Sequence, residues 1–473
     1  MDRQQILAID QGTHASRAIV FDHQGSLIAS AQQTVALRRL DHIRIEQDAM
    51  EILASTQQVM AQVLSAPGVH TAELRAAGLA TQRSSVVAWN RVTGTALSPV
   101  LSWQDRRNAA LLDGLAAQQS AIAQKTGLRL SAHYGASKLR WLLEQQPAVA
   151  SAHATGELLM GPLVSWLLFH LLSGHPVLVD AANASRTLLW NLQTRDWDQD
   201  LLALFHVPLQ VLPACLPICA EYGITGNGGI PLRAVNGDQT AALYAQGKPA
   251  PGTIIVNIGT GAFVLLPVQD VTTRPAGLLA GISQSNAHGA DYYLEGTVNG
   301  AGAALEWAAE QLSVGDVAQQ LPGWLADIED PPLFINTVGG LGAPWWQPGP
   351  EPYFTTAPAS PAHGMVAVVE SILFLVQANI ALLQSHMPDI TCIQLSGGLA
   401  NPDRLCQKLA DLSGLTVQRP VQVEATARGI AWQAAGCPPH WPASASGDTF
   451  QPCANPGLQT RYRKFLAALK QQL

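Results

Sequence analysis

Runs of apolar and polar residues divide the N-terminal part of the chain into short strands and one helix. The apolar runs are rich in strand-forming residues, are bounded by turns, and predict strands at 6–9, 18–22, 26–30, 74–80 and 85–89. Residues 48–64 carry apolar side chains at helical spacing behind Asp48, an acid suited to cap a helix. Strands that alternate with helices predict an α/β layered architecture.

The C-terminal part repeats this pattern of strands, glycine-rich turns and helices. The expected elements are a hairpin at 253–266, a glycine-rich stretch at 296–302 that opens a helix, a buried helix from Gly364 to about Met387, and a strand at 393–395 that runs into Gly397. Residues 248–252 are rich in proline and precede the repeat. We therefore predict two domains, 1–248 and 249–473.

The longest apolar run, at 158–172, is expected to be a buried helix. It contains Gly161, Pro162 and His170 and is too short to span a membrane. The first five residues carry no basic region ahead of an apolar stretch, so no signal peptide is expected. We predict no membrane partner for the chain.

Composition narrows the class of protein. The chain has 473 residues, of which 48% are hydrophobic and 13% charged, so it can bury sizeable cores in more than one domain. The net charge is −7 with no long basic run, which argues against a nucleic-acid partner; the basic tail at 461–464 is expected to be a solvated helix surface. Six cysteines without a C-x-x-C pair suit buried or inert thiols in a reducing cytosol, so a cytoplasmic location is expected.

Two segments far apart in the chain have nearly the same sequence. Residues 9–13 and 256–261 each join two apolar runs, so both are expected to be β-hairpins with Gly-Thr tips, Gly12-Thr13 and Gly259-Thr260. A glycine lets backbone N–H groups approach an anion, and a threonine adds a hydroxyl donor. One such tip can be an ordinary tight turn; the repetition favours a polyphosphate held from both sides.

Asp10, Asp238 and residues 103–107 each have a simple structural interpretation, and for Asp10 and residues 103–107 a chemical one is also open. Asp10 can cap the first turn, or it can serve a Mg²⁺ site through oxygen ligands or waters. Asp238 follows a glycine where a helix of small residues begins, so it can be an N-cap. Residues 103–107 can be a helix start with surface charges, or Trp103 can offer its ring to the carbon skeleton of a polyol.

In this order, the motifs of the chain resemble those of the FGGY carbohydrate kinases, most closely the glycerol-kinase-like branch, and are also similar to xylulokinases. The matching stretches run from residue 6 to about 436 and include 10–17, 81–83, 103–107, 183–187, 237–239, 259–261, 295–302, 340–344 and 397–398. Any one of these stretches is a weak signal, but nine in register are specific. The resemblance implies an α/β, two-domain actin/hexokinase/Hsp70-like ATPase fold, made of duplicated ribonuclease H-like domains with a central cleft.

The resemblance also assigns roles to individual residues. The implied catalytic base is Asp238, and the implied Mg²⁺ residues are Asp10 and Asp238. The implied substrate-binding residues are Arg83, Ser84, Trp103, His133, Asp238, Gln239 and Phe263. The implied ATP-binding residues are Gly12, Thr13, Ser16, Arg17, Gly259, Thr260, Gly302, Gly397, Gly398 and Asn401.

The chain departs from the glycerol-kinase pattern at the acceptor side. Ser84 stands where those kinases have a glutamate that grips two hydroxyls, and His133 lies beside Tyr134 where they have a substrate-binding tyrosine. An aspartate of the pattern falls near Val164 or Ser165. Loss of a charged hydrogen bond costs about 1.5–3 kcal/mol, which makes glycerol a poor fit and favours a longer polyol or a ketose.

The expected function is an ATP-dependent kinase, with Mg²⁺, of a small sugar or polyol. One alternative is a ketose kinase of the xylulose type; another is a catalytically silent sensor of sugar and nucleotide, for which a general base would have no use. A chaperone-type ATPase acting on proteins would share the phosphate hairpins but has no need of residues 103–107. A small-molecule substrate is the expected partner, and a homodimer is compatible with the resemblance.

Overall fold

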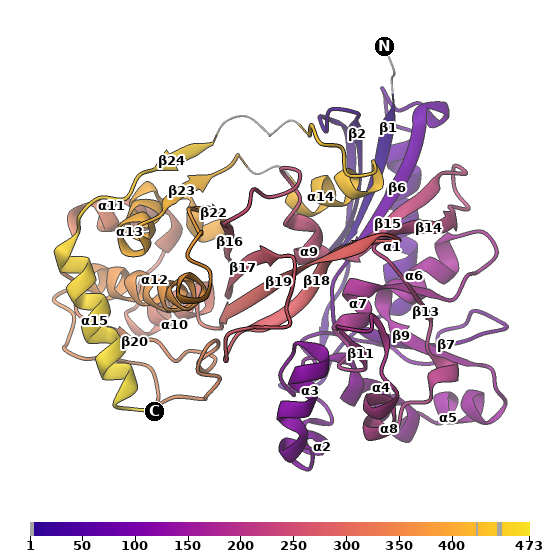
Figure 1. Cartoon of the computed structure of the whole chain (residues 1–473), viewed down its shortest axis with the longest axis horizontal. Coiled ribbons are helices and arrows are strands. Elements are labelled where there is room, and N and C mark those ends of the chain that lie inside the picture. The colour runs from indigo at the N-terminus through magenta and orange to yellow at the C-terminus, as the bar shows by residue number, and fades with distance from the viewer. Residues whose placement is uncertain (1–3, 422–423, 442–446) are drawn as a thin grey trace. The chain divides into compact units, whose positions relative to one another are not determined.

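The structure is a computed structural model that describes residues 4–421, 424–441 and 447–473 (Figure 1). The chain divides into two units: Met1–Pro249, Ala280–Tyr292 and Val423–Ala443 form the first, and Ala250–Leu279, Tyr293–Gln422 and Ser444–Leu473 form the second. Two short segments that follow residue 249 in the sequence are thus grouped with the first unit, so the units are not two consecutive halves of the chain.

A six-stranded mixed sheet forms the centre of the first unit. Its strands, in spatial order, are β14 (Cys219–Ile224), β15 (Pro231–Gly237), β6 (Leu74–Thr81), β1 (Gln5–Gln11), β2 (Ala15–Asp22) and β3 (Leu27–Thr34). β1, β2 and β3 are antiparallel, as predicted, whereas β6 runs parallel to both β1 and β15. Every residue of β1 is buried, as expected of a central strand.

Two helices pack on this sheet. Helix α1 (Ala49–Leu64) contacts β2 and β3, and its predicted cap is confirmed, since Asp48 accepts hydrogen bonds from the backbone N–H groups of Met50 and Glu51. Helix α14 (Ala425–Ala434) contacts β1, β6 and β15. Gly78 is needed for this contact, because a Cβ at that position would lie 2.7 Å from the carbonyl oxygen of Ile430.

A second sheet in the first unit corrects one prediction. Its order is β4 (Arg38–Arg39), β5 (Ile45–Gln47), β8 (Val100–Leu101), β7 (Val86–Asn90) and β9 (Leu158–Pro162). The run at 158–172, predicted to be one helix, is therefore a strand followed by helix α6 (Leu163–Leu171). Residues 158–162 pair antiparallel with β7, and an apolar run of this kind does not by itself distinguish a buried strand from a buried helix.

The remaining elements of the first unit are short. The helices are α2 (Ala109–Asp113), α3 (Gln119–Thr126), α4 (Gly135–Gln145), α5 (Pro147–Ala154), α7 (Ala181–Ser185), α8 (Gln199–Phe205) and α9 (Asp238–Ala242). The strands are β10 (Leu178–Asp180), β11 (Trp190–Asn191), β12 (Asp196–Trp197) and β13 (Ala214–Leu216). Helix α9 begins with Asp238, and helix α4 carries Lys138.

The second unit is built on another mixed sheet. The strand order is β18 (Leu279–Asn286), β19 (Gly289–Val298), β17 (Ala262–Val268), β16 (Thr253–Ile258), β22 (Cys392–Ser396), β23 (Thr416–Arg419) and β24 (Asp448–Phe450), with most of β18 and the start of β19 grouped with the first unit. The predicted hairpin is confirmed as β16 and β17. The glycine-rich stretch opens a helix only at Gly302, because residues 296–298 still belong to β19.

The other elements of the second unit are mainly helices. They are α10 (Gly302–Gln311), α11 (Val317–Asp327), α12 (Pro361–His386), α13 (Asp403–Ser413) and α15 (Pro456–Lys470), with the short strands β20 (Phe334–Ile335) and β21 (Tyr353–Phe354). Within the described ranges, only α12 is long and apolar enough to cross a membrane, and 83% of its most apolar window is buried inside the structure. It is therefore a core helix, as the nearly continuous apolar sequence predicted.

A buried charge cluster joins α12, α13 and α15. The Glu370 carboxylate lies 2.7 Å from the amine of Lys408 and 2.7 Å from the Arg461 guanidinium. All three residues are buried. The basic tail was predicted to be a solvated surface, which holds for Arg463 and Lys464 but is wrong for Arg461, because that side chain is turned inward onto Glu370.

Replacement of Glu370 tests this cluster. Glu370→Gln leaves two buried cations without their counter-charge and should lower the free energy of unfolding by about 3 kcal/mol. The matched control is Asp330→Asn, since Asp330 also contacts Arg461, at 3.1 Å, but its side chain is 90% exposed. The control should change stability by less than about 1 kcal/mol in urea unfolding. Equal effects of the two variants would contradict the prediction.

Candidate active site

The loops that follow β1, β6 and β15 converge at one edge of the first unit's sheet. The three strands are parallel, and their register places Gln11 opposite Thr81 and Thr81 opposite Gly237. Buried glutamines tie the loops together: the Gln82 side chain donates to the side-chain oxygen of Gln11 at 3.1 Å and to that of Gln47 at 2.9 Å. The residues just beyond these strand ends, which include Arg83 and Asp238, therefore share one edge.

Asp238 is the first residue of α9, and the cap position belongs to Gly237. The interpretation of Asp238 as an N-cap is therefore wrong. Its side chain is 29% exposed, and its Oδ1 lies 3.8 Å from Nε of Arg83. Burial raises the pKa of Asp238, while Arg83 counteracts this by favouring the charged form.

Arg83 is positioned by its neighbours on both sides. Its guanidinium donates a hydrogen bond to the side-chain oxygen of Gln239. Its aliphatic part lies against Gly237, where a Cβ would come within 2.3 Å of the Arg83 Cδ. Thus Gly237 is required for close packing rather than for an unusual backbone angle, and Arg83, Asp238 and Gln239 form one contact group.

Asp10 is a second acid at the same edge. It is buried near the end of β1, and its Oδ2 lies 3.5 Å from the Arg17 guanidinium. Burial and then the negative charge of Asp238 raise its pKa to about 7, while Arg17 opposes the rise. Glu424, which the sequence did not single out, also lies 3.9 Å from Arg17. It stands at the start of α14 with no local motif, so only the fold brings it to this site.

The donor set at this edge fits a magnesium ion carried by phosphates. In the described part of the chain, no three His, Cys, Asp or Glu side chains form a metal cage. Mg²⁺ commonly keeps several waters and takes one or two protein carboxylates together with substrate phosphates. Asp10 and Asp238 supply two such carboxylates, and each lies near an arginine. The negative charge of Asp238 raises the pKa of Asp10.

Trp103, His133 and Ser84 are among the residues implied to bind the substrate that is phosphorylated, the acceptor. The Trp103 ring meets His133 edge-on with centroids 5.7 Å apart, and its Nε1 donates to the Thr13 hydroxyl at 2.9 Å. Thus a residue implied for the substrate contacts one implied for ATP. Ser84 adopts φ 63° and is buried, and its hydroxyl has no hydrogen-bond partner among the described residues.

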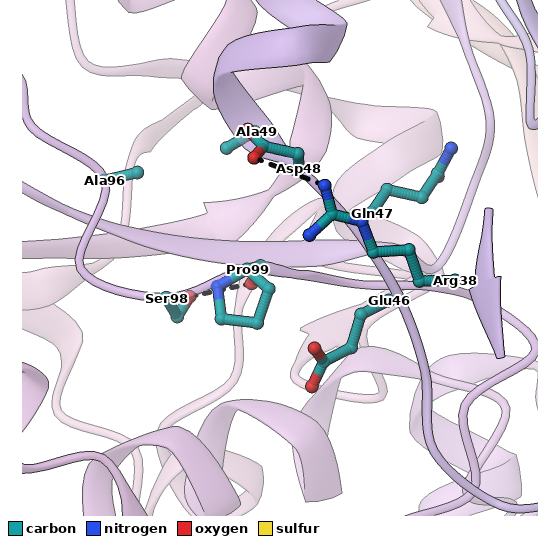
Figure 2. Close-up of a pocket in the computed structure, with 8 residues that line it drawn as sticks. All are labelled: Arg38, Glu46, Gln47, Asp48, Ala49, Ala96, Ser98 and Pro99. Atoms are coloured by element: carbon teal, nitrogen blue, oxygen red, sulfur yellow. Dashed lines mark hydrogen bonds and ion pairs between the residues drawn. The ribbon is translucent and has the colours of Figure 1, made fainter. Parts of the chain in front are cut away.

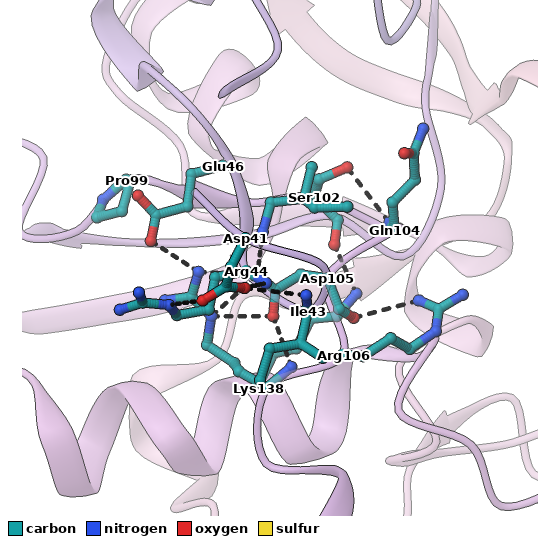
Figure 3. Close-up of polar contacts among 12 residues, drawn as sticks. Asp41, Ile43, Arg44, Glu46, Pro99, Ser102, Gln104, Asp105, Arg106 and Lys138 are labelled. Carbon is teal, nitrogen blue, oxygen red and sulfur yellow. Dashed lines mark hydrogen bonds and ion pairs between the residues drawn. The ribbon is translucent and has the colours of Figure 1, made fainter. Parts of the chain in front are cut away.

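The chemically dense stretch 103–107 serves two purposes. Asp105 is fully buried and accepts hydrogen bonds from the backbone N–H of Ile45 and the guanidinium of Arg107, which also contacts Glu46 at 2.7 Å. Figure 3 shows the carboxylates of Asp105 and Glu46 within this group of polar contacts. Arg106 donates to the Trp103 carbonyl at 2.7 Å. The charged residues therefore hold the loop rigid, and Trp103 is the member that reaches the site. This removes the interpretation of the stretch as surface charges.

Hydrogen bonds within the hairpin and from the Gln47 side chain hold the first Gly-Thr tip in place. The Gly12 N–H donates to the Ala15 carbonyl at 2.9 Å, and the Thr13 carbonyl accepts from the Gln47 side chain at 2.8 Å. Ser16 was also predicted to bind ATP. Its side chain is fully buried and bonds the Ser55 hydroxyl of α1 at 2.8 Å, so its hydroxyl gives no support to that role.

The second unit gathers most of its implied ATP residues in the same way. The Gly302 N–H donates to the Gly259 carbonyl at 2.9 Å, and the Ala303 N–H donates to the Thr260 carbonyl at 3.0 Å, so the tip lies on the first turn of α10. A Cβ at Gly302 would lie 2.8 Å from the Gly259 carbonyl oxygen. Gly397 has φ 99° and lies against Ile258 at the end of β16.

The other implied residues of the second unit lie near these turns. There is open space where a Cβ would stand at Gly398, Asn401 is exposed after the neighbouring turn, and Phe263 is the second residue of β17, where it pairs with Asn257. The implied nucleotide residues of this unit thus cluster on the loops after β16 and β22.

A separate hollow of about 230 Å³ lies between β5, the start of α1 and the loop before β8 (Figure 2). It is lined by Arg38, Glu46, Gln47, Asp48, Ala49, Ala96, Ser98 and Pro99. None of the implied site residues belongs to it. We therefore place the chemistry at the strand edge and not in this hollow.

Comparison with known proteins identifies the family to which the chain is similar. The N-terminal domain of the FGGY family of carbohydrate kinases matches residues 5–243, and the C-terminal domain of that family matches residues 254–436. A glycerol kinase of Shewanella amazonensis is 34% identical over 448 residues, covering 91% of this chain and 90% of that protein. A glycerol kinase of Paracidovorax citrulli is 35% identical over 461 residues, with the same two coverages of 91% and 90%.

Solved structures agree on the fold. A Plasmodium falciparum glycerol kinase with ADP has a TM-score of 0.90 at 23% identity and covers 100% of this chain and 98% of its own. A xylulose kinase from Rhodospirillum rubrum has a TM-score of 0.85 at 20% identity and covers 99% of each chain. The predicted actin/hexokinase/Hsp70-like ATPase fold is confirmed.

The raised pKa of Asp10 predicts how stability depends on pH. Because the folded state favours the protonated acid, the ligand-free protein loses stability as the pH rises from about 4 to about 7. Asp10→Asn removes this penalty, so the variant should exceed the wild type above pH 7 by up to about 4 kcal/mol and match it below pH 4. Urea unfolding at several pH values measures the difference, and a difference that does not vary with pH would contradict the prediction.

Proposed function

The chain belongs to the FGGY family of carbohydrate kinases, and on that premise we propose that it transfers the γ-phosphoryl group of ATP to a hydroxyl of a small sugar or polyol, with Asp238 as general base. It is a phosphotransferase with an alcohol group as acceptor, as the family matches and glycerol kinase relatives establish. The observation that carries the rest is an accessible Asp238 carboxylate 3.8 Å from Arg83 at the edge where three strands end.

Asp238 has the properties that proton acceptance requires. A sugar hydroxyl is a poor nucleophile, and a carboxylate bonded to it can take its proton as the bond to phosphorus forms. Burial raises the pKa of Asp238, which makes it a stronger base than a solvent-exposed aspartate, and the charge of Arg83 opposes this rise. Arg83 and Gln239, bonded to each other, are placed to orient acceptor hydroxyls beside the base.

Each Gly-Thr tip offers backbone and hydroxyl donors suited to the phosphate oxygens of ATP. The proposed contacts are Gly12, Thr13, Arg17, Gly259, Thr260, Gly302, Gly397, Gly398 and Asn401, with Ser16 contributing at most its backbone. Asp10 and Asp238 would hold Mg²⁺, which, when bound, neutralises phosphate charge. Alignment of the reactants and this neutralisation account for most of the rate in phosphoryl transfer.

The acceptor side favours a longer polyol or a ketose over glycerol. Ser84 offers a short buried hydroxyl without a partner in the described residues, which is a hydrogen-bonding group for an additional acceptor hydroxyl. Trp103 and His133 supply an aromatic wall for the carbon skeleton. The role of Phe263 in substrate binding stays a prediction. A xylulose-type ketose is therefore the second candidate acceptor, supported by the unpartnered hydroxyl of Ser84.

A silent sensor of the same fold is the alternative from another class. The accessible Asp238 favours the enzyme, because a sensor has no use for a base. ADP release measured against a panel of polyols, aldoses and ketoses separates the two: stimulation by one acceptor supports the kinase, and binding of sugar without ADP release supports the sensor. A cytoplasmic location and a homodimer stay predictions.

Substitution of the base tests the mechanism. Asp238→Asn keeps the size of the side chain but removes proton acceptance, so turnover should fall by at least about 10²-fold. ATP affinity, measured by calorimetry on the same preparation, should stay within a few-fold of the wild type, which controls for misfolding. A near-normal turnover number would sink the assignment of Asp238.

Residue 84 tests the acceptor preference. Ser84→Glu introduces a carboxylate that can accept hydrogen bonds from two hydroxyls, so kcat/KM for glycerol should rise at least about tenfold. Ser84→Ala is the matched control, because it removes the hydroxyl without adding charge and should leave glycerol use unchanged. If Ser84→Glu lowers glycerol use while a larger acceptor is still phosphorylated, the proposed role of residue 84 is wrong.

A further inference from the structure

Lys138 is a fully buried lysine whose amine contacts only backbone oxygens. It lies on α4 and donates to the carbonyl groups of Ser84 at 3.0 Å, Ser102 at 2.8 Å and His133 at 2.8 Å. Figure 3 shows the amine beside Ser102 and the Asp105 loop. Among the residues that the structure describes, it takes part in no ion pair.

These three carbonyl groups belong to the three segments that line the acceptor side. Ser84 and His133 are themselves implied acceptor contacts, and Ser102 directly precedes Trp103. The segments follow β6, follow β8 and precede α4, so Lys138 is the point at which they are joined. Ser84 and Ser102 lie 54 and 36 residues from Lys138 in the sequence.

We propose that Lys138 is a positioning residue of the acceptor site, whose ammonium group sets the mutual geometry of the Ser84, Trp103 and His133 segments and places its positive charge beside His133. This role rests on the proposed function, because it assigns these three segments to acceptor binding. Lys138 itself does not touch the acceptor.

The number of hydrogen bonds made by the Lys138 amine indicates which of its charge states joins the three segments. An ammonium group has three N–H donors, whereas a neutral amine has two and directs a lone pair at the third carbonyl oxygen. The three contacts of Lys138 therefore match the protonated form. Burial lowers the pKa of Lys138 and Arg106 and Arg107 lower it further, while Asp105 raises it, so deprotonation comes within reach of alkaline buffers.

The buried charge also acts on His133. Burial and then the charge of Lys138 lower the pKa of His133, with smaller effects of Arg106, Arg186 and Arg83 in the same direction. A neutral imidazole can both donate and accept hydrogen bonds, which an imidazolium cannot. That property suits the recognition of a hydroxyl group, which also does both.

A second buried lysine shows what a purely structural role looks like. Lys408 in the second unit is also buried, but its amine lies 2.7 Å from the Glu370 carboxylate. A buried cation without a counter-charge is costly. Lys138 instead donates to three backbone carbonyl groups at the point where the acceptor segments meet, which indicates a use beyond packing.

The test compares Lys138→Met with Lys408→Met in the full-length protein, using the acceptor found in the panel. Lys138→Met should lower kcat/KM for the acceptor by about 10²-fold, since misplacement by about 1 Å is enough for that loss. The KM for ATP should stay within about threefold. Lys408→Met should lower stability and leave the acceptor KM unchanged. Equal changes in both KM values, or an equal acceptor effect of Lys408→Met, would overturn the proposal.

Two pH measurements add readouts that a structural role would not move. In the wild type, acceptor kcat/KM should fall with a midpoint below 10.5, the ordinary value for lysine, while nucleotide affinity stays flat, and this fall should be absent in Lys138→Met. NMR titration of His133 should show its pKa rising in the variant, because a nearby cation has been removed.

Each failure has its own signature. If the variant does not fold, the wild-type profile decides, and the absence of an alkaline fall specific to the acceptor overturns the proposal. If no acceptor is phosphorylated by the wild type, the proposed function fails, and the His133 titration still tests the effect of Lys138. An unchanged His133 pKa in Lys138→Met would then overturn its electrostatic part.

Discussion

The parallel alignment of β1, β6 and β15 is the constraint on which the candidate site depends. Parallel strands end at the same edge of a sheet, so the loops after Gln11, Thr81 and Gly237 meet without any further device. The hydrogen bonds of the buried glutamines then tie two of these loops together. Without this register, an acid from the first hairpin and an acid more than two hundred residues later would have no reason to influence each other.

Two carboxylates at one edge repel each other. Burial and the negative charge of Asp238 raise the pKa of Asp10, and the guanidinium group of Arg17 opposes this rise only in part. A cation that arrives with the phosphates would complete the neutralisation. The repulsion between the carboxylates is therefore smaller when a cation is bound, which is consistent with a nucleotide and its metal binding there together.

The acceptor side depends on rigid support more than on many direct contacts. The buried Asp105 and Arg107 hold the Trp103 loop, and Lys138 joins this loop to the segments of Ser84 and His133. Variation at a few inward positions, such as residue 84, can then change which acceptor fits without disturbing the frame.

The sequence by itself determined the alternation of strands and helices, the two Gly-Thr hairpins, the cap at Asp48 and the family, because these are local patterns or ordered motifs. It mistook residues 158–162 for helix and Arg461 for surface, because a uniform apolar run has no period and a charged residue does not announce its partner. Only the tertiary structure brought Glu424 to Arg17, turned Ser16 inward and placed Lys138 under three carbonyl groups. These contacts join residues that are far apart in the sequence. Local sequence patterns do not predict such pairs, because the pairs arise only when the folded sheet brings the residues together.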